Sequence, residues 1–421
     1  MNLENIKPAK AHEGQPWRFL ATGDWASIRI HGDAARRAPS ALYGERLADE
    51  IAAADFSMVN LECCLGGQEP LPKDGPNLKG DPASPAALKK AGFDFAVLAN
   101  NHIADFQAAG VRETLEACRA AGLAASGAGM NLEEAFRPWL GEYGGVRVGV
   151  LSVCDREDGE ASLFDAGTAC IFDVMVHERL RALRAKCDLL ILVVHGGREY
   201  VPVPPVYWRD KVLALAACGA DMVIGHHPHV PQGMTLLKRD RGPDVPVFFS
   251  IGNFVFRPAA LNPGLIPPFT DMGFAVRADF IGASLQKVDL LPYRILGSKG
   301  PRAVANEELE DLARFYTALS EPLVDAKQVS DWFDAVCDHF WEREVRERVG
   351  ELTRKFYEGD REAMCHAINH HQSYAHHTLI TRAMQRILLG QAGQTPPDIR
   401  EKLQGWFQGQ WPMRKSPVIS G

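Results

Sequence analysis

Three histidines stand directly after a short apolar run in the segment 223–230, Val-Ile-Gly-His-His-Pro-His-Val. A β-branched apolar run of this kind is typical of a buried strand. The glycine permits a sharp turn that would direct the imidazoles above the edge of the sheet, where open α/β folds bind ligands. Imidazole is a common ligand of transition metals. The segment therefore favours a metal site, although a polar loop whose histidines only form hydrogen bonds would also fit.

Polar side chains also stand at the ends of other predicted apolar strands. These strands are expected over residues 17–22, 56–61, 93–98, 189–194 and 245–251, with helices over 41–54, 85–91, 106–121, 173–186 and 206–218. The polar residues at or just beyond the strand ends are Asp24, Asn60, Glu62, Asn101, His102, Asp105, His195, Glu199, Tyr200 and Asn253. Together with His226, His227 and His229, they are candidates for a single site.

The chemical types in this set suit divalent ions. Carboxylate, amide oxygen and imidazole together match hard-to-borderline metals. Two ions held ~3.5–4 Å apart need a carboxylate that bridges them, and such a pair activates a water and holds the transferring phosphoryl oxygens. Glu62 is the best candidate for the bridge, and His102, beside Asn101, is the candidate proton donor. Because no cysteine or serine lies in a nucleophile elbow, a metal-bound water is the expected nucleophile.

Composition narrows the partners and the compartment. A net charge of -7 and a pI of about 6.1 argue against nucleic acid as a ligand, because nucleic-acid-binding domains need a basic face. The nine cysteines are odd in number and include no Cys-x-x-Cys pair, which favours a reducing compartment. No run approaches the roughly eighteen apolar residues of a membrane helix, and the N-terminus has no apolar signal region. We therefore expect a cytoplasmic protein without a membrane span, and nothing in the sequence indicates its oligomeric state.

The pattern changes near residues 297–301, Gly-Ser-Lys-Gly-Pro. It predicts a β-hairpin just before this point, over 272–281 and 285–295, and helices beyond it, over 307–320, 329–357 and 361–390. The chain is accordingly divided into a domain over 15–298 and a helical C-terminal extension over 302–421.

The extension contains a cluster of histidines, which are His366, His370, His371, His376 and His377. His366 and His370 would share one helix face at i,i+4. The cluster lacks a His-Glu-x-x-His pattern, and a histidine pair on a helix is more often solvated or hydrogen-bonded than bound to metal. A second metal site here is therefore the less favoured interpretation.

Six motifs occur in a fixed order along the chain. They are Gly23-Asp24, Asn60-Leu61-Glu62, Leu98-Ala-Asn-Asn-His-Ile-Ala-Asp105, His195-Gly-Gly-Arg-Glu-Tyr200, Gly225-His-His-Pro-His-Val230 and Phe249-Ser-Ile-Gly-Asn-Phe-Val-Phe256. This ordered set resembles the CapA family of capsule and poly-γ-glutamate synthesis proteins, a branch of the calcineurin-like metallophosphoesterases. The resemblance covers roughly residues 17–295. It implies an α/β fold, a four-layer α/β/β/α sandwich with the site at the carboxyl ends of the strands.

The resemblance also implies roles for individual residues. The metal ligands would be Asp24, Glu62, Asn101, His195, His227 and His229, with Glu62 as the bridge between two divalent ions. Mn, Zn, Fe and Mg are not distinguished. His102 and Asp105 would be the catalytic residues. The segment Asp24-Trp25-Ala26 lacks the histidine of the usual Asp-x-His, so one imidazole ligand is missing and one ion would be held less tightly.

Further residues of the motifs would contact the substrate. They are Asn60, Arg198, Glu199, Tyr200, His226 and Asn253. Arg198 would pair with a phosphate or carboxylate or be an ordinary surface arginine, and Glu199 and Tyr200 would bind substrate or only shape the pocket.

Three functions stay open from the sequence. The first is a metal-dependent, phosphoesterase-like hydrolase that uses a metal-bound water and a histidine acid. The second is an enzyme of γ-glutamyl or peptide amide chemistry, in which Glu199 holds a substrate amine. The third is a non-catalytic accessory protein of polyglutamate or capsule biosynthesis. The expected partner is a small molecule or polymer that carries phosphate or γ-glutamyl groups.

Overall fold

A mainly parallel sheet forms one half of the centre of the computed structural model, which describes residues 14–240, 242–256, 267–341 and 346–410. Its strands are β1 (Pro16–Trp25), β2 (Phe56–Leu61), β3 (Phe95–Val97), β4 (Ala124–Ser126), β13 (Asn253–Val255), β14 (Met272–Ile281), β15 (Ser284–Ile295) and β16 (Pro301–Ala303). The strand order is β16-β15-β14-β1-β2-β3-β4, and β13 pairs with β1. Strands β1 to β4 are parallel, whereas β14 to β16 are antiparallel.

A second sheet packs against the first. Its strands are β6 (Trp139–Tyr143), β7 (Val146–Cys154), β9 (Leu189–His195), β10 (Met222–His226), β11 (Met234–Leu237) and β12 (Val245–Phe248). They follow the order β11-β12-β10-β9-β7-β6, with a parallel centre and antiparallel edges. A separate small ribbon pairs β5 (Ala128–Gly129) with β8 (Gly167–Thr168).

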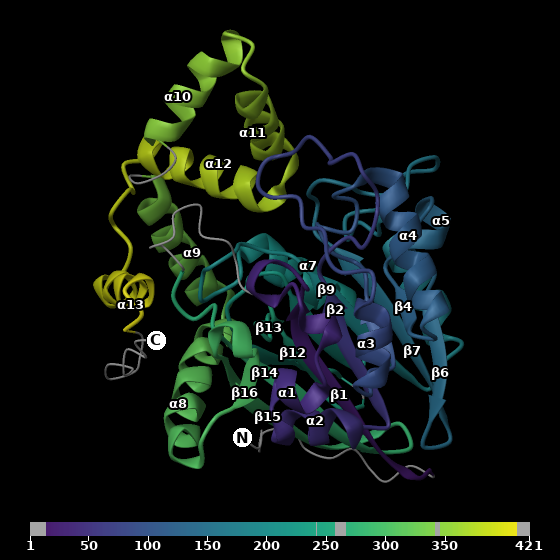
Figure 1. Ribbon diagram of the computed structural model, residues 1–421. Helices are drawn as coiled ribbons and strands as arrows, with labels where there is room; N and C mark the ends of the chain where they lie inside the picture. Colours follow the sequence, from purple (N-terminus) through teal and green to yellow (C-terminus); the bar gives the residue numbers. More distant parts are fainter. Residues whose placement is uncertain (1–13, 241, 257–266, 342–345, 411–421) are drawn as a thin grey trace.

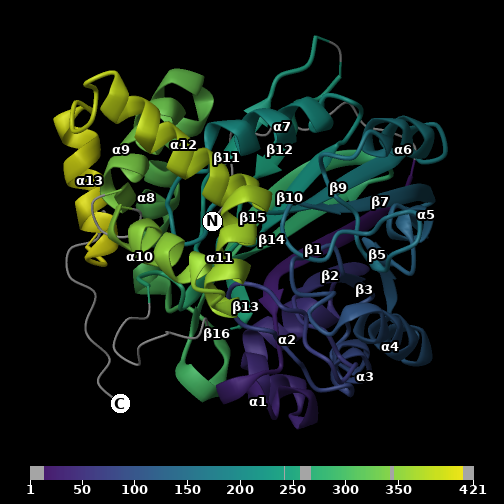
Figure 2. The same ribbon diagram turned by 90° about the horizontal axis from the view of Figure 1, so that it is seen from above.

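Helices cover the outer faces of the two sheets. These helices are α1 (Pro39–Tyr43), α2 (Glu45–Ala52), α3 (Ser84–Lys90), α4 (Gln107–Ala120), α5 (Leu132–Ala135), α6 (Met175–Arg184) and α7 (Val206–Ala216). Figure 2 shows α1 to α4 on one side of the sheets and α6 and α7 on the other. The arrangement confirms the predicted four-layer α/β/β/α sandwich.

Alternation along β1 explains how one strand serves two apolar cores. Phe19 and Ala21 belong to the core between the sheets. Leu20, between them, belongs to the core under α1 to α4. Because successive side chains of a strand point to opposite faces, a strand buried on both sides is apolar at every position. The run Phe19-Leu20-Ala21 meets this requirement, and every side chain of β2 is likewise buried.

Three of the long predicted helices are wrong in extent. The region 41–54 forms α1 and α2, because Gly44 between them has a φ of 74°, outside the helical range. The region 361–390 forms α11 (Arg361–Gln372) and α12 (Tyr374–Leu388), and the Ser373 side chain accepts from the His376 N–H to begin α12. The region 329–357 forms α9 (Ala326–Phe340) and α10 (Arg346–Tyr357), with residues 342–345 outside the described part.

The sequence pattern also misses several short elements. Strands β6, β11 and β16 lie at sheet edges, where short strands bury little and give a weak apolar signal. Helix α13 (Pro397–Phe407) lies in the tail that the pattern leaves without structure. The predicted hairpin is confirmed as β14 and β15, and all nine cysteines are free.

The C-terminal helices pack against the sheets and not only against each other. Besides α9 to α13 they include α8 (Leu309–Ser320), and Figure 1 shows α10 to α12 above the strand ends. Phe315, Trp332 and Trp406 belong to the same apolar core as the facing sides of the two sheets. Among the C-terminal helices, Arg386 forms ion pairs with Asp334 and Asp338.

The domain boundary expected at 298–302 stays a prediction, and β16 at 301–303 joins the first sheet. Among the described residues, none of the helices has the length and apolar character needed to cross a bilayer.

We expect Phe315→Ala to lower the free energy of unfolding by about 3–5 kcal/mol, the usual cost of deleting a buried phenyl ring. The ring is fully buried, with its centroid 5.3 Å from that of Phe269 and 6.2 Å from that of Trp406. Chemical denaturation followed by circular dichroism measures the change. Phe164→Ala is the control, because Phe164 is 91% exposed. If part of the transition keeps its midpoint in Phe315→Ala, the extension unfolds as an independent unit.

Candidate metal centre

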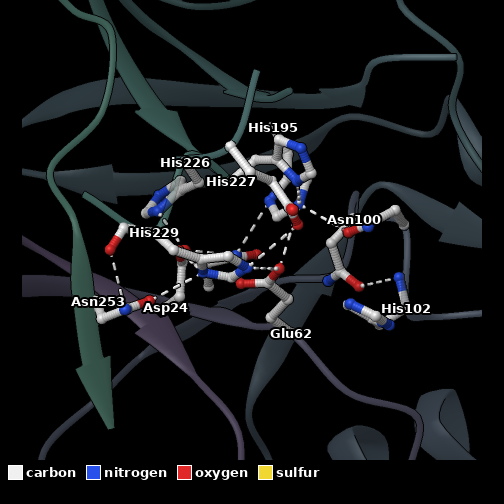
Figure 3. A network of polar contacts seen from close by, with 12 residues as sticks. Asp24, Glu62, Asn100, His102, His195, His226, His227, His229 and Asn253 are labelled. Carbon is white, nitrogen blue, oxygen red and sulfur yellow. Dashed lines mark hydrogen bonds and ion pairs between the residues drawn. The ribbon is translucent and has the colours of Figure 1, made fainter. Parts of the chain in front are cut away.

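Four parallel strands bring the polar motifs to one edge of the sandwich. In the first sheet Asp24 lies opposite Asn60, and Glu62 follows the last residue of β2. In the second sheet His195 and His226 are paired at the ends of β9 and β10. Because the carboxyl ends of parallel strands share an edge, residues far apart in sequence meet there. Figure 3 shows the imidazoles turned toward the carboxylates of Asp24 and Glu62.

One group of ligand atoms surrounds His195 Nε2. The Oδ1 atom of Asn101 lies 3.0 Å from it, His227 Nδ1 lies 3.2 Å from it, and Glu62 Oε1 lies 3.5 Å from it. Glu62, His195 and His227 each present an atom within 4.8 Å of the others, which is close enough to share one ion. Asn101 adds a fourth donor, so the predicted members of this site come together.

A second group of ligand atoms includes the same carboxylate. Asp24, Glu62 and His229 form it, again with ligand atoms within 4.8 Å of one another. His229 Nδ1 lies 3.5 Å from Asp24 Oδ2, and His229 Nε2 lies 3.6 Å from Glu62 Oε1. Glu62 belongs to both groups, as a bridging ligand must. The geometry therefore supports the bridging role that the sequence predicts for Glu62.

Burial tests whether these residues fit a metal. Asp24 and Glu62 are both 0% exposed. Asp24 Oδ2 and both carboxylate oxygens of Glu62 have no hydrogen-bond partner among the described residues. A buried carboxylate oxygen without a partner is costly, and a bound cation removes that cost. The donor set of carboxylate, amide and imidazole is the one that divalent ions take in proteins, so the residues fit.

The charges of the centre divide unequally between the two carboxylates. Burial, with the nearby charges of Asp24 and Glu199, raises the pKa of Glu62 well above its usual value. Burial would also raise the pKa of Asp24, but the neighbouring imidazoles of His226 and His229 hold it well below the usual value. Two neighbouring buried carboxyl groups, such as Asp24 and Glu62, do not both ionise freely unless a cation lies between them.

The imidazoles of the first group are held in their neutral, ligating form. Burial and the charge of His227 keep the pKa of His195 well below its usual value. Burial lowers the pKa of His227 to about 4. Because a metal binds only the deprotonated imidazole nitrogen, these shifts favour an ion over protons at neutral pH.

The backbone is strained where it carries the ligands. His227 has a φ of 99° and His229 a φ of 58°. Positive φ at residues other than glycine costs about 1–3 kcal/mol each and occurs mostly at functional sites. Tyr200, with a φ of 61°, faces this turn and donates its N–H to the Pro228 carbonyl at 2.9 Å.

Three predicted substrate contacts lie behind the ligands. Asn60 Nδ2 donates to Asp24 Oδ1 at 2.8 Å, and His226 Nδ1 lies 3.1 Å from the same oxygen. His229 Nδ1 donates to Asn253 Oδ1 at 2.9 Å. All three residues are fully buried. This geometry favours a positioning role for Asn60, His226 and Asn253, because metal ligands are oriented by such outer contacts.

The predicted catalytic pair stands beside the first group. His102 Nδ1 lies 2.7 Å from Asp105 Oδ2, and Lys73 pairs with the other oxygen of Asp105. Burial lowers the pKa of His102. Burial would raise the pKa of Asp105, but the charges of His102 and Lys73 lower it. Asp105 therefore stays ionised and fixes the ring of His102, as a carboxylate partner does for a catalytic histidine.

The last three residues of the His195–Tyr200 motif point in different directions. Glu199 Oε1 lies 3.8 Å from His229 Nε2, and the ring of Tyr200 stacks on that of His229 at 5.9 Å. Arg198 turns away toward the C-terminal helices, where Nη1 lies 3.3 Å from His376 Nε2. Glu199 and Tyr200 thus border the second ligand group, whereas Arg198 contacts the extension.

Two residues at the centre have no assigned role from the sequence. Glu157 Oε1 lies 3.6 Å from His227 Nε2. It follows β7, so the pattern of polar residues after a buried strand would have found it. Lys73 pairs with Asp105, and its side chain is only 4% exposed. Its loop has no apolar periodicity that would place it.

The family model for the bacterial capsule synthesis protein PGA_cap matches residues 18–258. The chain belongs to this family. The match includes every residue assigned above to the two ligand groups.

Curated proteins with similar sequences are named for capsule, PGA or polyglutamine synthesis. The capsule biosynthesis protein CapA of Bacillus anthracis is 34% identical over 176 residues, which are 40% of this chain and 42% of the relative. The PGA biosynthesis protein CapA of Bacillus subtilis is 28% identical over 43% of this chain and 47% of its own length. A probable polyglutamine synthesis accessory protein of Mycobacterium tuberculosis is 30% identical over 51% of this chain and 59% of its own. The chain thus spans about half the length of the curated relatives it matches.

The solved structures that align with this chain have lower sequence identity than the curated relatives. A hypothetical protein from Thermus thermophilus has 18% identity and a TM-score of 0.41 over 66% of this chain and 99% of its own. The NAD nucleotidase of Haemophilus influenzae has 11% identity and a TM-score of 0.41 over 76% of this chain and 60% of its own. A phosphatase from Mycoplasma has 13% identity and a TM-score of 0.39 over 70% of this chain and 97% of its own.

We expect Glu157→Gln to remove a pH dependence from the metal-free protein. Burial and the charge of Glu199 raise the pKa of Glu157 from 4.5 to about 8. The folded state therefore holds its proton more tightly than the unfolded state, and stability falls as pH rises from about 4.5 to about 8. The loss is at most about 1.4 kcal/mol per pH unit.

Thermal unfolding in a chelator between pH 5 and 9 measures this effect. The melting temperature of the wild type should fall relative to that of Glu157→Gln up to pH 8, with a constant difference above it. Glu142→Gln, at an exposed position of β6, serves as the control. Parallel curves for wild type and Glu157→Gln would show that Glu157 ionises normally.

Proposed function

We propose that this protein is a metal-dependent, phosphoesterase-like hydrolase with two divalent ions. One observation carries the proposal: two groups of buried ligand atoms share Glu62 beside a histidine that a carboxylate orients. Two adjacent ions supply an activated water and stabilise charge on the oxygens of a transferring phosphoryl group. The family resemblance of the sequence points the same way.

The chain's own residues have distinct tasks in this reaction. Glu62 would hold both ions, while Asn101, His195 and His227 would complete the first group and Asp24 and His229 the second. In its protonated imidazolium form, His102 would donate its Nε2 proton to the leaving oxygen and become neutral. The Asp105 carboxylate accepts from Nδ1 of His102 and leaves Nε2 for the substrate. Lys73 balances the charge of Asp105.

The two sites differ in their donors. Four side chains surround the first site, but three surround the second. Ala26 stands at the position where the usual Asp-x-His motif supplies another imidazole, and it is buried. The first site should therefore bind its ion more tightly. Mn, Zn, Fe and Mg are all compatible with the mixed oxygen and nitrogen set.

Amide chemistry is a second candidate, favoured by a specific feature. Glu157 and Glu199 place two carboxylates next to the imidazoles of His227 and His229. A substrate ammonium, such as the amino group of a γ-glutamyl unit, would bind there. The names of the relatives, which refer to capsule and polyglutamate synthesis, suit such a substrate. An accessory protein without turnover is the third candidate. Metal content and the product, inorganic phosphate or a cleaved amide, separate the three.

We expect Glu62→Ala to remove both ions and His227→Ala to remove one, because only Glu62 belongs to both groups. Elemental analysis of protein purified with added Mn or Zn gives the number of ions per chain. His371→Ala, an exposed histidine on α11, should leave the metal content unchanged. Full metal content in both variants would place the metal elsewhere.

We expect His102→Ala to keep the metal and to lower kcat for p-nitrophenyl phosphate by about 10²–10⁴-fold, the usual contribution of a general acid. Phosphate release and elemental analysis on the same preparation provide the measurement. An unchanged kcat with this substrate would exclude the acid role. A wild type that holds two ions yet hydrolyses only γ-glutamyl amides would favour the second candidate.

A further inference from the structure

The C-terminal helices reach the rim of the metal centre at three loops. Gln372 donates to the Glu157 carbonyl at 2.9 Å, after β7. Tyr374 stacks on Phe172 at 4.2 Å. His366 Nδ1 lies 2.7 Å from Asp74 Oδ2, in the loop that carries Lys73. Figure 2 shows α11 and α12 crossing above the strand ends. The junction between α11 and α12 is therefore held against the loops that border the metal centre.

Arg198 lies in this corner between two rings of the extension. Its guanidinium carbon is 4.9 Å from the centre of the Phe340 ring on α9. On α12, His376 offers both ring nitrogens to Nη1, at 3.4 Å and 3.3 Å. Arg198 and His376 are both partly exposed, so a solute can reach them.

The positive charge of Arg198 lacks a direct counter-charge. In the part of the chain that the structure describes, the contacts of its guanidinium are rings and not carboxylates. Its buried Nε–H has no acceptor there. Arginine stays charged at any working pH, and a partly desolvated cation is stabilised by an oxyanion that accepts from its parallel N–H groups.

Imidazoles continue the same surface away from Arg198. The ring of His376 lies 5.8 Å from that of His370, which lies 4.0 Å from that of His366. A neutral imidazole has one N–H to donate. Both nitrogens of His376 lie near Arg198 Nη1, and in the neutral ring one of them can accept from it while the other carries the N–H.

The metal centre is one residue away along the chain. Glu199, next to Arg198, lies 3.8 Å from His229 of the second ligand group. The substrate of such a subsite has to extend past Glu199, from the ligand groups to Arg198. We propose that Arg198 and His376 form a subsite for a second oxyanion of the substrate, a carboxylate or a phosphate, so that doubly anionic substrates are preferred. This inference rests on the proposed metal centre and adds the substrate class.

Non-hydrolysable probes test the subsite without turnover. Calorimetry measures the affinity of the full chain, loaded with Mn, for propylphosphonate, 3-phosphonopropionate and propane-1,3-diphosphonate. The homologues of each probe that are one methylene shorter or longer are measured as well. 3-Phosphonopropionate carries a carboxylate as its second charged group, and propane-1,3-diphosphonate carries a second phosphonate. We expect at least one two-headed probe to bind about tenfold more tightly than propylphosphonate, the effect of a charge-assisted hydrogen bond.

Variants of Arg198 and His376 show whether these residues cause the tighter binding of the two-headed probes. Arg198→Gln and His376→Ala should abolish the tenfold gain and leave propylphosphonate binding within about twofold of the wild type. Arg198→Lys should retain part of it, because the charge remains but the planar fork is lost. Arg147→Gln, which removes an exposed arginine paired with Asp188, is the matched control and should retain all of it.

The outcomes separate the subsite from the proposed function. Equal affinity for one-headed and two-headed probes, or an undiminished gain in Arg198→Gln, overturns the subsite even if the enzyme hydrolyses phosphate esters. If propylphosphonate does not bind but a two-headed probe binds through Arg198, the proposed phosphoesterase centre fails and the subsite stands.

Discussion

The fully buried carboxylate of Glu62 is the constraint on which the site depends. Both of its oxygens lack a hydrogen-bond partner among the described residues, and Asp24 and Glu199 add negative charge nearby. Such a group is tolerated when it is protonated or when cations neutralise it. The neutral imidazoles of His195 and His227 cannot supply that charge, so the arrangement fits a cation site. Strand β2, buried along its whole length, holds the carboxylate rigidly in place.

The extension contributes to the same site through the loops it covers. Trp406 of α13 donates its indole N–H to the Tyr200 carbonyl at 2.9 Å, and Tyr200 in turn stacks on His229. Together with the contacts of α11 and α12, this places helices from the end of the chain around residues that precede them by 170 positions or more. The helices therefore shape the mouth of the centre, and their apolar faces complete the core.

Local patterns predict the centre well where one strand end supplies both its position and its chemistry. Asp24, Glu62, His195 and His227 each follow a buried strand, and all four meet. The same rule would have found Glu157, which follows β7. It places Asn60, His226 and Asn253 in the site but cannot tell a ligand's support from a substrate contact. That distinction depends on which atom faces the carboxylate, and the residue type does not determine this.

The sequence by itself determined the two-sided apolar strands, the order of the motifs and the types of ligand atom, because burial and strand periodicity are local properties. Only the tertiary structure decided which candidate ligands come together, since Asp24 and His229 meet through the packing of two different sheets. It also decided the partners of Lys73 and Arg198. Both lie in segments without periodicity, and their contacts are set by Asp105 and by helices that fold across the strand ends.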